Sequence, residues 1–220
     1  MTHIHSTALI GESVQIGERV EIGPYAVIEG PCEIHDDVFI GAHCVIGADP
    51  QARGVYPYPL DASRSAHELV IRQGACLREH VVAHRGVVGP TIIGRDALIM
   101  LGAHVGHDCI IGDETTLGSV SLLGGFTMIA ERVTFGQGVV THPWVCVGEA
   151  AMVGLNSSVL RDVEPFEKIA GAHRVLGLNE HRIDDAYDRS LIGGSAKAAM
   201  RWSNLTRYRD QVRAFWDARG

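Results

Sequence analysis

The residues around position 107 are the side chains in this chain best suited to proton transfer. His107 is followed directly by Asp108, and His104 precedes it by three positions. A neutral imidazole can accept a proton near pH 7, and a neighbouring carboxylate can supply the partner that orients the ring. We therefore predict that His107 is a general base and that Asp108 assists it, although a histidine taken alone in a repeat protein is usually a surface residue.

A six-residue repeat decides which other residues lie beside this pair. From Ile93 to Val159 every sixth residue is aliphatic or bulky, with Thr141 as the polar exception, and glycine usually follows it. A period of six fits neither an amphipathic helix nor a two-faced strand, but it is the period of a hexapeptide β-helix. Three hexads make one triangular coil, so positions three hexads apart stack on successive coils.

This stacking places a glycine above the candidate base. Gly125 comes three hexads after His107, so a notch without a side chain is expected over the imidazole. The Gly125 amide could then donate a hydrogen bond to an oxyanion. His142 lies one coil further along the same edge, at a corner where glycine is usual. We predict that His142 contacts substrate, although a histidine at an exposed corner is the simpler alternative.

The repeat organises most of the chain. It begins near Ile4 and predicts a β-helix over residues 1–166, interrupted by external loops at 48–68 and 84–91. Three prolines and the absence of hexads mark the first loop, and loops that leave a β-helix often carry binding residues. Residues 167–220 lack the hexads and show apolar residues at helical spacing, so a mostly helical extension is expected there.

Composition and charge favour a cytoplasmic protein. The net charge is −7, and no apolar stretch is long enough for a membrane span, so neither nucleic-acid binding nor stable membrane insertion is expected. The cysteine spacing suggests no zinc site, and we predict no bound metal. Arginines in the tail, including Arg201, Arg207 and Arg213, could dock an acidic partner or simply form a solvated helix face.

Three longer motifs carry a family resemblance. The stretches LREHVVAHRG (77–86), GAHVGHDCIIG (102–112) and AGAHRVLGLN (170–179) resemble the UDP-N-acetylglucosamine O-acyltransferase family of lipid A biosynthesis. The resemblance implies a left-handed parallel β-helix, whereas ordinary β-crossovers are right-handed. It also implies a homotrimer with active sites between subunits, in which a hydroxyacyl group moves from acyl carrier protein to a sugar hydroxyl.

The resemblance also implies roles for single residues. His107 matches the catalytic histidine of the family, and Gly125 matches its oxyanion glycine. His104 and His142 match further histidines of the family, and His84 matches the histidine of its His-Arg-Gly stretch. Two residues of the third stretch, His173 and Asn179, could contact donor or acceptor, or could merely end the coil.

Some positions depart from the family pattern and put the acceptor in doubt. Phe126 stands where the family has histidine after the oxyanion glycine, and Pro143 stands where it has glutamine. In the first loop Gln51 matches, but Ala52 and Gly54 replace the family's aspartate and lysine. We expect Gln51 and Phe126 to contact a substrate whose binding pocket differs from that of the family.

These features together predict an all-β acyltransferase with a short helical tail. The acyl donor would be a thioester, with acyl carrier protein favoured over coenzyme A, and no separate cofactor is expected. The acceptor would be a hydroxyl or amine of a sugar or nucleotide sugar, and no cysteine or serine lies beside His107 to form a covalent intermediate. An acetyl-CoA-dependent aminosugar N-acetyltransferase, a gamma-type carbonic anhydrase and a non-catalytic trimeric scaffold are the alternatives.

Overall fold

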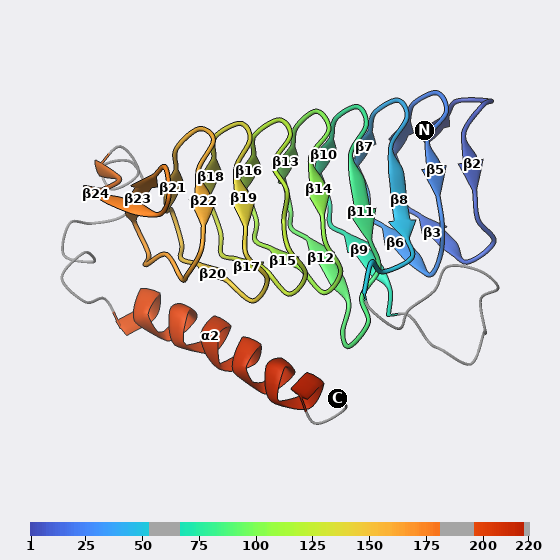
Figure 1. Cartoon of the computed structure of the whole chain (residues 1–220). Helices are drawn as coiled ribbons and strands as arrows, with labels where there is room; N and C mark the ends of the chain where they lie inside the picture. The colour runs from blue at the N-terminus through green and yellow to red at the C-terminus, as the bar shows by residue number, and fades with distance from the viewer. Residues whose placement is uncertain (53–66, 181–195, 218–220) are drawn as a thin grey trace.

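The described residues form a β-helix with one helix beside it (Figure 1). The computed structural model describes residues 1–52, 67–180 and 196–217. Short parallel strands wind into about eight coils, which confirms the predicted left-handed parallel β-helix. Glu21 pairs with His3 and Thr134 with Thr116, so equivalent positions in uninterrupted coils are three hexads apart, as predicted.

Three sheets make the faces of the prism. Sheet A contains β1 (His3–Ile4), β4 (Glu21–Ile22), β7 (Phe39–Ile40), β10 (Cys76–Leu77), β13 (Leu98–Ile99), β16 (Thr116–Leu117), β18 (Thr134–Phe135), β21 (Met152–Val153), β23 (Glu167–Ala170) and β24 (Arg174–Leu178). Sheet B contains β2 (Leu9–Ile10), β5 (Val27–Ile28), β8 (Val45–Ala48), β11 (Val82–His84) and β14 (His104–Val105), continued by the pair β19 (Val140–Thr141) and β22 (Ser158–Val159). Sheet C contains β3 (Val14–Ile16), β6 (Cys32–Ile34), β9 (Leu69–Ile71), β12 (Thr91–Ile93), β15 (Ile110–Ile111), β17 (Met128–Ile129) and β20 (Cys146–Val147).

The inward aliphatic residues form the core. Each is covered by the equivalent residue of the coils before and after it, and full burial of such a side chain contributes about 1.5–3 kcal/mol. In the first coil Ile4 and Ile10 are 42 % and 36 % exposed, whereas the equivalent residues of the middle coils are fully buried. Thr141, the polar exception, is buried. Its hydroxyl oxygen accepts a hydrogen bond from the Gly124 amide at 3.1 Å and lies 2.8 Å from the Thr127 hydroxyl.

The two predicted loops leave the β-helix where the register jumps. Phe39 pairs with Cys76, and Cys76 pairs with Leu98, so extra residues are accommodated outside the coils at both places. Most of the first loop, residues 53–66, lies outside the described residues. The buried Arg85 joins the bases of the loops, since it forms an ion pair with Asp49 and donates to the Gly30 carbonyl at 2.6 Å.

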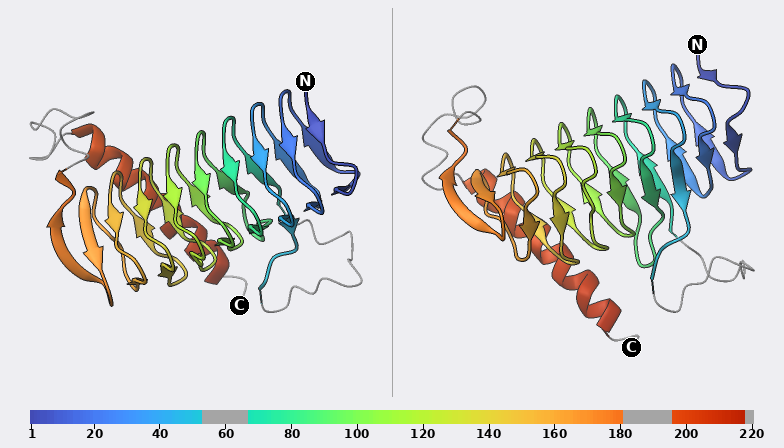
Figure 2. Two further views of the ribbon diagram at one scale, coloured as in Figure 1. Left: turned by 90° about the horizontal axis from the view of Figure 1, so that it is seen from above. Right: turned by 45° about the horizontal axis from the view of Figure 1, so that its top comes forward.

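The C-terminal extension begins as sheet before it becomes helix. β23 pairs in parallel with β21, and β24 turns back antiparallel to β23, so sheet A continues across the predicted boundary at residue 166. The boundary itself stays a prediction. Helix α2 (Ala196–Asp217) then runs back along the β-helix toward its middle coils (Figures 1 and 2). In the described part of the chain no helix combines the length and apolar character needed to span a bilayer.

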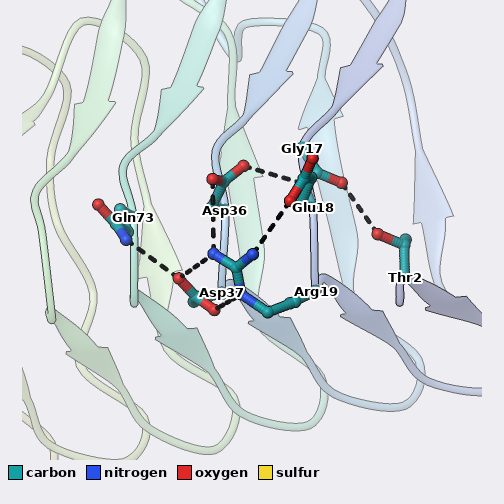
Figure 3. Close-up of polar contacts among 7 residues, drawn as sticks. All are labelled: Thr2, Gly17, Glu18, Arg19, Asp36, Asp37 and Gln73. Atoms are coloured by element: carbon teal, nitrogen blue, oxygen red, sulfur yellow. Dashed lines mark hydrogen bonds and ion pairs between the residues drawn. The ribbon is translucent and has the colours of Figure 1, made fainter.

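Surface ion pairs link neighbouring coils at the corner between sheets C and A. Arg19 donates to both carboxylate oxygens of Asp37, at 2.5 and 2.9 Å, and Gln73 donates to the same carboxylate from the next coil at 3.0 Å (Figure 3). The hydrogen bond from Arg19, followed by that from Gln73, lowers the pKa of Asp37 to about 2. These contacts connect three coils through side chains that remain exposed.

Replacing Asp37 should produce a small, pH-dependent loss of stability. Because the folded pKa of Asp37 is depressed, its contribution is present above about pH 4 and is lost as the pH falls through about 2. We expect Asp37→Asn to lower the melting temperature slightly at pH 7, since the group is fully exposed and screened by solvent. The difference from wild type should shrink between about pH 4 and pH 2.

Thermal melts at several pH values check this expectation, with Glu12→Gln as the control. Glu12 is an exposed carboxylate on an early coil, with no ion pair among the described residues. The substitution removes the same charge without breaking a link between coils. Equal effects of the two substitutions would mean that net charge, and not the contact with Arg19, produces the change.

Candidate active site

His107 and Asp108 form a hydrogen-bonded pair at the corner between sheets B and C. The His107 Nδ1 lies 2.7 Å from Asp108 Oδ2, and the two side chains are 12 % and 3 % exposed. A carboxylate only accepts, so this contact assigns the proton to Nδ1 and leaves Nε2 with its lone pair. The two residues predicted to act together are thus in direct contact, and the catalytic role of the pair remains a prediction.

The loop at residues 84–91 holds the Asp108 carboxylate. Three successive backbone amides, those of Val87, Val88 and Gly89, donate to its oxygens at 2.8–2.9 Å. The turn that aims them is tight, because a Cβ on Gly86 would lie 1.6 Å from the Gly89 carbonyl oxygen. The sequence analysis missed these donors, since backbone amides leave no side-chain pattern. Gly86 and Gly89 were the signal in the sequence for a tight turn in this loop.

Gly125 lies directly over the imidazole, as the three-hexad spacing predicted. A Cβ atom at Gly125 would stand 2.6 Å from His107 Nε2, too close for any side chain. The Gly125 amide makes no backbone hydrogen bond in the described part of the chain, whereas the next amide, that of Phe126, donates to the His107 carbonyl at 2.9 Å. The Gly125 amide, which is not used in backbone pairing there, therefore lies on the residue packed against the His107 ring.

His84 and His104 extend this edge by one coil. Their strands are paired, and their ring centroids lie 5.0 Å apart. Burial lowers the pKa of both imidazoles, which favours the neutral form at pH 7. His84 Nδ1 lies 2.6 Å from the Asp49 carbonyl oxygen and so carries the proton. Its buried Nε2 is an acceptor without a partner among the described residues.

A second group of predicted residues lies around a cavity of about 600 Å³ between the last coils and α2. The exposed His142 and the buried His173 both line it, together with Arg161 and Arg213. Burial lowers the pKa of His173, and its Nδ1 has no partner in the described ranges. The residues predicted from the sequence to form one site thus lie in two groups, one beside His107 and one around this cavity.

Two predicted contact residues have less evident roles. Asn179 is buried, donates its side-chain amide to the Ala150 carbonyl at 2.9 Å, and donates its backbone amide to Phe166 at 2.8 Å. These bonds close the end of the β-helix and satisfy the donors that substrate would otherwise use. Gln51 is exposed at the start of the first loop. Gly54, also named in the sequence analysis, lies outside the described residues.

Phe126 is buried between the base and a residue that the sequence analysis missed. Its ring meets His107 edge-on, with centroids 5.0 Å apart, and stacks on Trp144 at 3.7 Å. Only 3 % of Phe126 is exposed, so it forms a wall of the site. Trp144 comes three hexads after Phe126, and this spacing was the signal that could have revealed it.

Within the described ranges no three histidine, cysteine, aspartate or glutamate side chains are grouped as metal ligands would be.

The chain matches the family model for bacterial transferase hexapeptides (six repeats) over residues 13–48. It is 33 % identical over 208 residues to the acyl-(acyl-carrier-protein)–UDP-N-acetylglucosamine O-acyltransferase of Halorhodospira halophila, covering 82 % of this chain and 78 % of that protein. The enzyme of the same name from Verminephrobacter eiseniae is 35 % identical over 201 residues, covering 81 % and 74 % of the two chains.

A solved structure shows the same fold. The UDP-N-acetylglucosamine acyltransferase of Francisella novicida superposes with a TM-score of 0.75 at 22 % identity, over 98 % of this chain and 88 % of that one. The superposition therefore includes residues of this chain beyond the hexapeptide repeats. The β-helix and the position of its coils are therefore shared with a known enzyme architecture.

Gly125→Ala tests the notch above the imidazole. The added methyl group would press on His107 Nε2, and the ring can move away only by weakening its contact with Asp108. We expect a folded protein whose turnover falls roughly 100-fold, the loss that a displacement of about 1 Å can cause. Steady-state kinetics and a melting curve measure the two effects.

Gly11→Ala is the matched control, because a Cβ there would meet its nearest neighbour, the Ile28 carbonyl oxygen, at 3.3 Å, a tight contact that a shift of a few tenths of an ångström relieves, against 2.6 Å at Gly125. Near-normal turnover of Gly125→Ala would show that the space above His107 is not used in the reaction. A general loss of stability in both variants would instead point to the glycine backbone.

Proposed function

The chain belongs to the UDP-N-acetylglucosamine O-acyltransferase family and is an acyltransferase, and we propose that it moves an acyl group from acyl carrier protein to a nucleotide-linked sugar with His107 as general base. The observation that carries this proposal is the arrangement around one imidazole. Asp108 holds Nδ1, and Nε2 lies against Gly125, whose amide makes no backbone hydrogen bond among the described residues.

The chemistry follows from the positions of these groups. His107 Nε2 takes the proton from the acceptor hydroxyl or amine, and the freed lone pair attacks the thioester carbonyl. Negative charge develops on the carbonyl oxygen, where the Gly125 amide can donate a hydrogen bond. The C–S bond then breaks, and the departing thiolate receives the proton from Nε2. The transfer is direct, since no serine or cysteine among the described residues contacts the His107 side chain as a nucleophile would.

His84 and His104 are suited to hold the acceptor. Both favour the neutral form, and the unpartnered Nε2 of His84 can accept a hydrogen bond from a sugar hydroxyl. A buried polar atom without a partner is costly, so a bound hydroxyl would recover a hydrogen bond that the empty site lacks. His142, further along the edge, would hold a part of the substrate remote from the reacting atoms.

We propose a homotrimer in which neighbouring subunits complete the site. One side of the candidate site is covered by the 84–91 loop, whereas the sheet B side is open. Large apolar side chains remain 42–55 % exposed along sheet B and the corner that precedes it, which favours burial against another copy. These residues are Leu101, Val120, Leu122 and Val140.

The donor and the acceptor are inferred from different parts of the molecule. Exposed arginines on the last elements, such as Arg174 and Arg207, favour an acidic carrier protein over free coenzyme A, although the chain is acidic overall. The acceptor side is altered by the apolar wall of Phe126 and by Ala52. A polar sugar loses directed contacts there, each worth about 1 kcal/mol when buried.

Removing each histidine separately tests the assigned roles. We expect His107→Ala to lower turnover about 100- to 10,000-fold, the usual range for the loss of a general base. His142→Ala should mainly raise the apparent KM, because His142 is assigned to binding. Steady-state kinetics measure both, and light scattering confirms that the assembly is intact. Near-normal turnover of His107→Ala together with inactivity of His142→Ala would reverse the two roles.

A panel of substrates tests the assigned donor and acceptor. We expect acyl carrier protein thioesters to be better donors than coenzyme A thioesters, and Arg207→Glu to raise the KM for the carrier-bound donor at low salt. UDP-N-acetylglucosamine should be a weak acceptor beside an analogue with an amine or a different sugar. Efficient acylation of UDP-N-acetylglucosamine would show that the altered wall is compatible with the family's acceptor. Turnover only with acetyl-CoA would favour an aminosugar N-acetyltransferase.

A further inference from the structure

A continuous series of ring contacts joins helix α2 to the candidate base. The Arg213 guanidinium carbon lies 5.9 Å from the centre of the Trp144 ring, within range of a cation–π contact. Trp144 stacks on Phe126 with 3.7 Å between centroids and 4° between planes. Phe126 then meets His107 at 5.0 Å and 88°, which is an edge-to-face contact.

The β-helix itself fixes the middle of this series. Phe126 and Trp144 occupy the same corner on successive coils, with left-handed φ angles of 62° and 69°. The coil spacing therefore places one ring over the other. Phe126 is almost completely buried, so it has little freedom to turn away. Its perpendicular contact restricts the plane of the His107 ring, whereas Asp108 restrains only one nitrogen.

Helix α2 is tied to the β-helix close to this point. Arg209 donates to Asp162 at 2.5 Å, and the other oxygen of Asp162 accepts the Cys146 amide at 2.8 Å. Arg213 lies one turn further along the helix. Tyr208 of the same helix lies beside the 84–91 loop, since a Cβ added to Gly89 would stand only 3.3 Å from the Tyr208 hydroxyl. The helix is therefore also close to the loop whose amides hold Asp108.

We propose that Trp144 is a positioning residue for His107 and that α2 keeps Trp144 in place through Arg213. The inference rests on the proposed role of His107 as the base. Trp144 acts through Phe126, which lies between it and the imidazole, and its loss should let the imidazole leave the orientation in which Nε2 faces the acceptor. The C-terminal helix then helps to orient the base, in addition to any role in binding a carrier protein.

Kinetics of two Trp144 variants test this inference. Trp144→Leu keeps an apolar side chain but removes the stacked ring, and kcat should fall roughly 10- to 100-fold, as expected for a misplaced catalytic group. The KM values should change by less than about twofold, because no ground-state contact with substrate is lost. Trp144→Phe restores a stacking ring and should recover most of kcat. Tyr25→Leu is the matched control, since Tyr25 stacks on His43 at another corner and should leave kcat unchanged.

Several outcomes would overturn the inference. A raised KM with unchanged kcat in Trp144→Leu would make Trp144 a substrate contact, and equal losses in the Leu and Phe variants would exclude the stacked ring as the cause. If Trp144→Leu fails to fold, Arg213→Ala decides, because Arg213 is exposed on the helix. We expect about a threefold fall in kcat there, partly restored by Arg213→Lys, as a cation–π contact predicts. An unchanged kcat in Arg213→Ala counts against the inference.

His107→Ala separates failure of this inference from failure of the proposed function. If His107→Ala loses turnover while Trp144→Leu and Arg213→Ala keep a normal kcat, only the positioning role is wrong. If His107→Ala retains turnover, the general base has been misassigned and the positioning role falls with it.

Discussion

Each coil of this protein buries its inward side chains against one another and against the coils before and after it. The structure therefore depends on an unbroken spacing of three hexads between stacked positions, and aliphatic side chains at every sixth position enforce that spacing. The same constraint builds the candidate site. It places Gly125 over His107 and Trp144 over Phe126, so one inserted residue in these coils would separate the base from its amide as surely as it would disrupt the core.

The fold and the centre of the site could be predicted because both follow from this periodicity. Val105, Leu123, Thr141 and Val159 form one column, as the hexads required, and the juxtaposition of His107 and Gly125 is a consequence of the same register. Even the polar exception has a local explanation, since Thr141 bonds to the Gly124 amide inside the core. A regular repeat lets a contact between distant residues be read from the sequence alone.

The parts that escaped prediction are those that do not repeat. The amides that hold Asp108 come from an irregular loop, and the Arg85–Asp49 pair joins two insertions of different length. The contact of Arg213 with Trp144 depends on how a helix docks on the side of the β-helix, for which the hexads carry no information. Sequence analysis thus placed Gly125 over the candidate base His107 but did not find the groups that hold the His107 side chain in position.

The first coil is less well buried than the coils in the middle of the molecule. Ile4 and Ile10 face inward yet remain partly exposed, so the cost of detaching this coil is lower than that of opening any coil in the middle. Backbone amides should therefore exchange with solvent fastest at the N-terminal end and more slowly toward the centre. The coils that carry His84, His104 and His107 lie several repeats inside that gradient. Local opening of the first coil can therefore proceed without disturbing the coils that carry the candidate site.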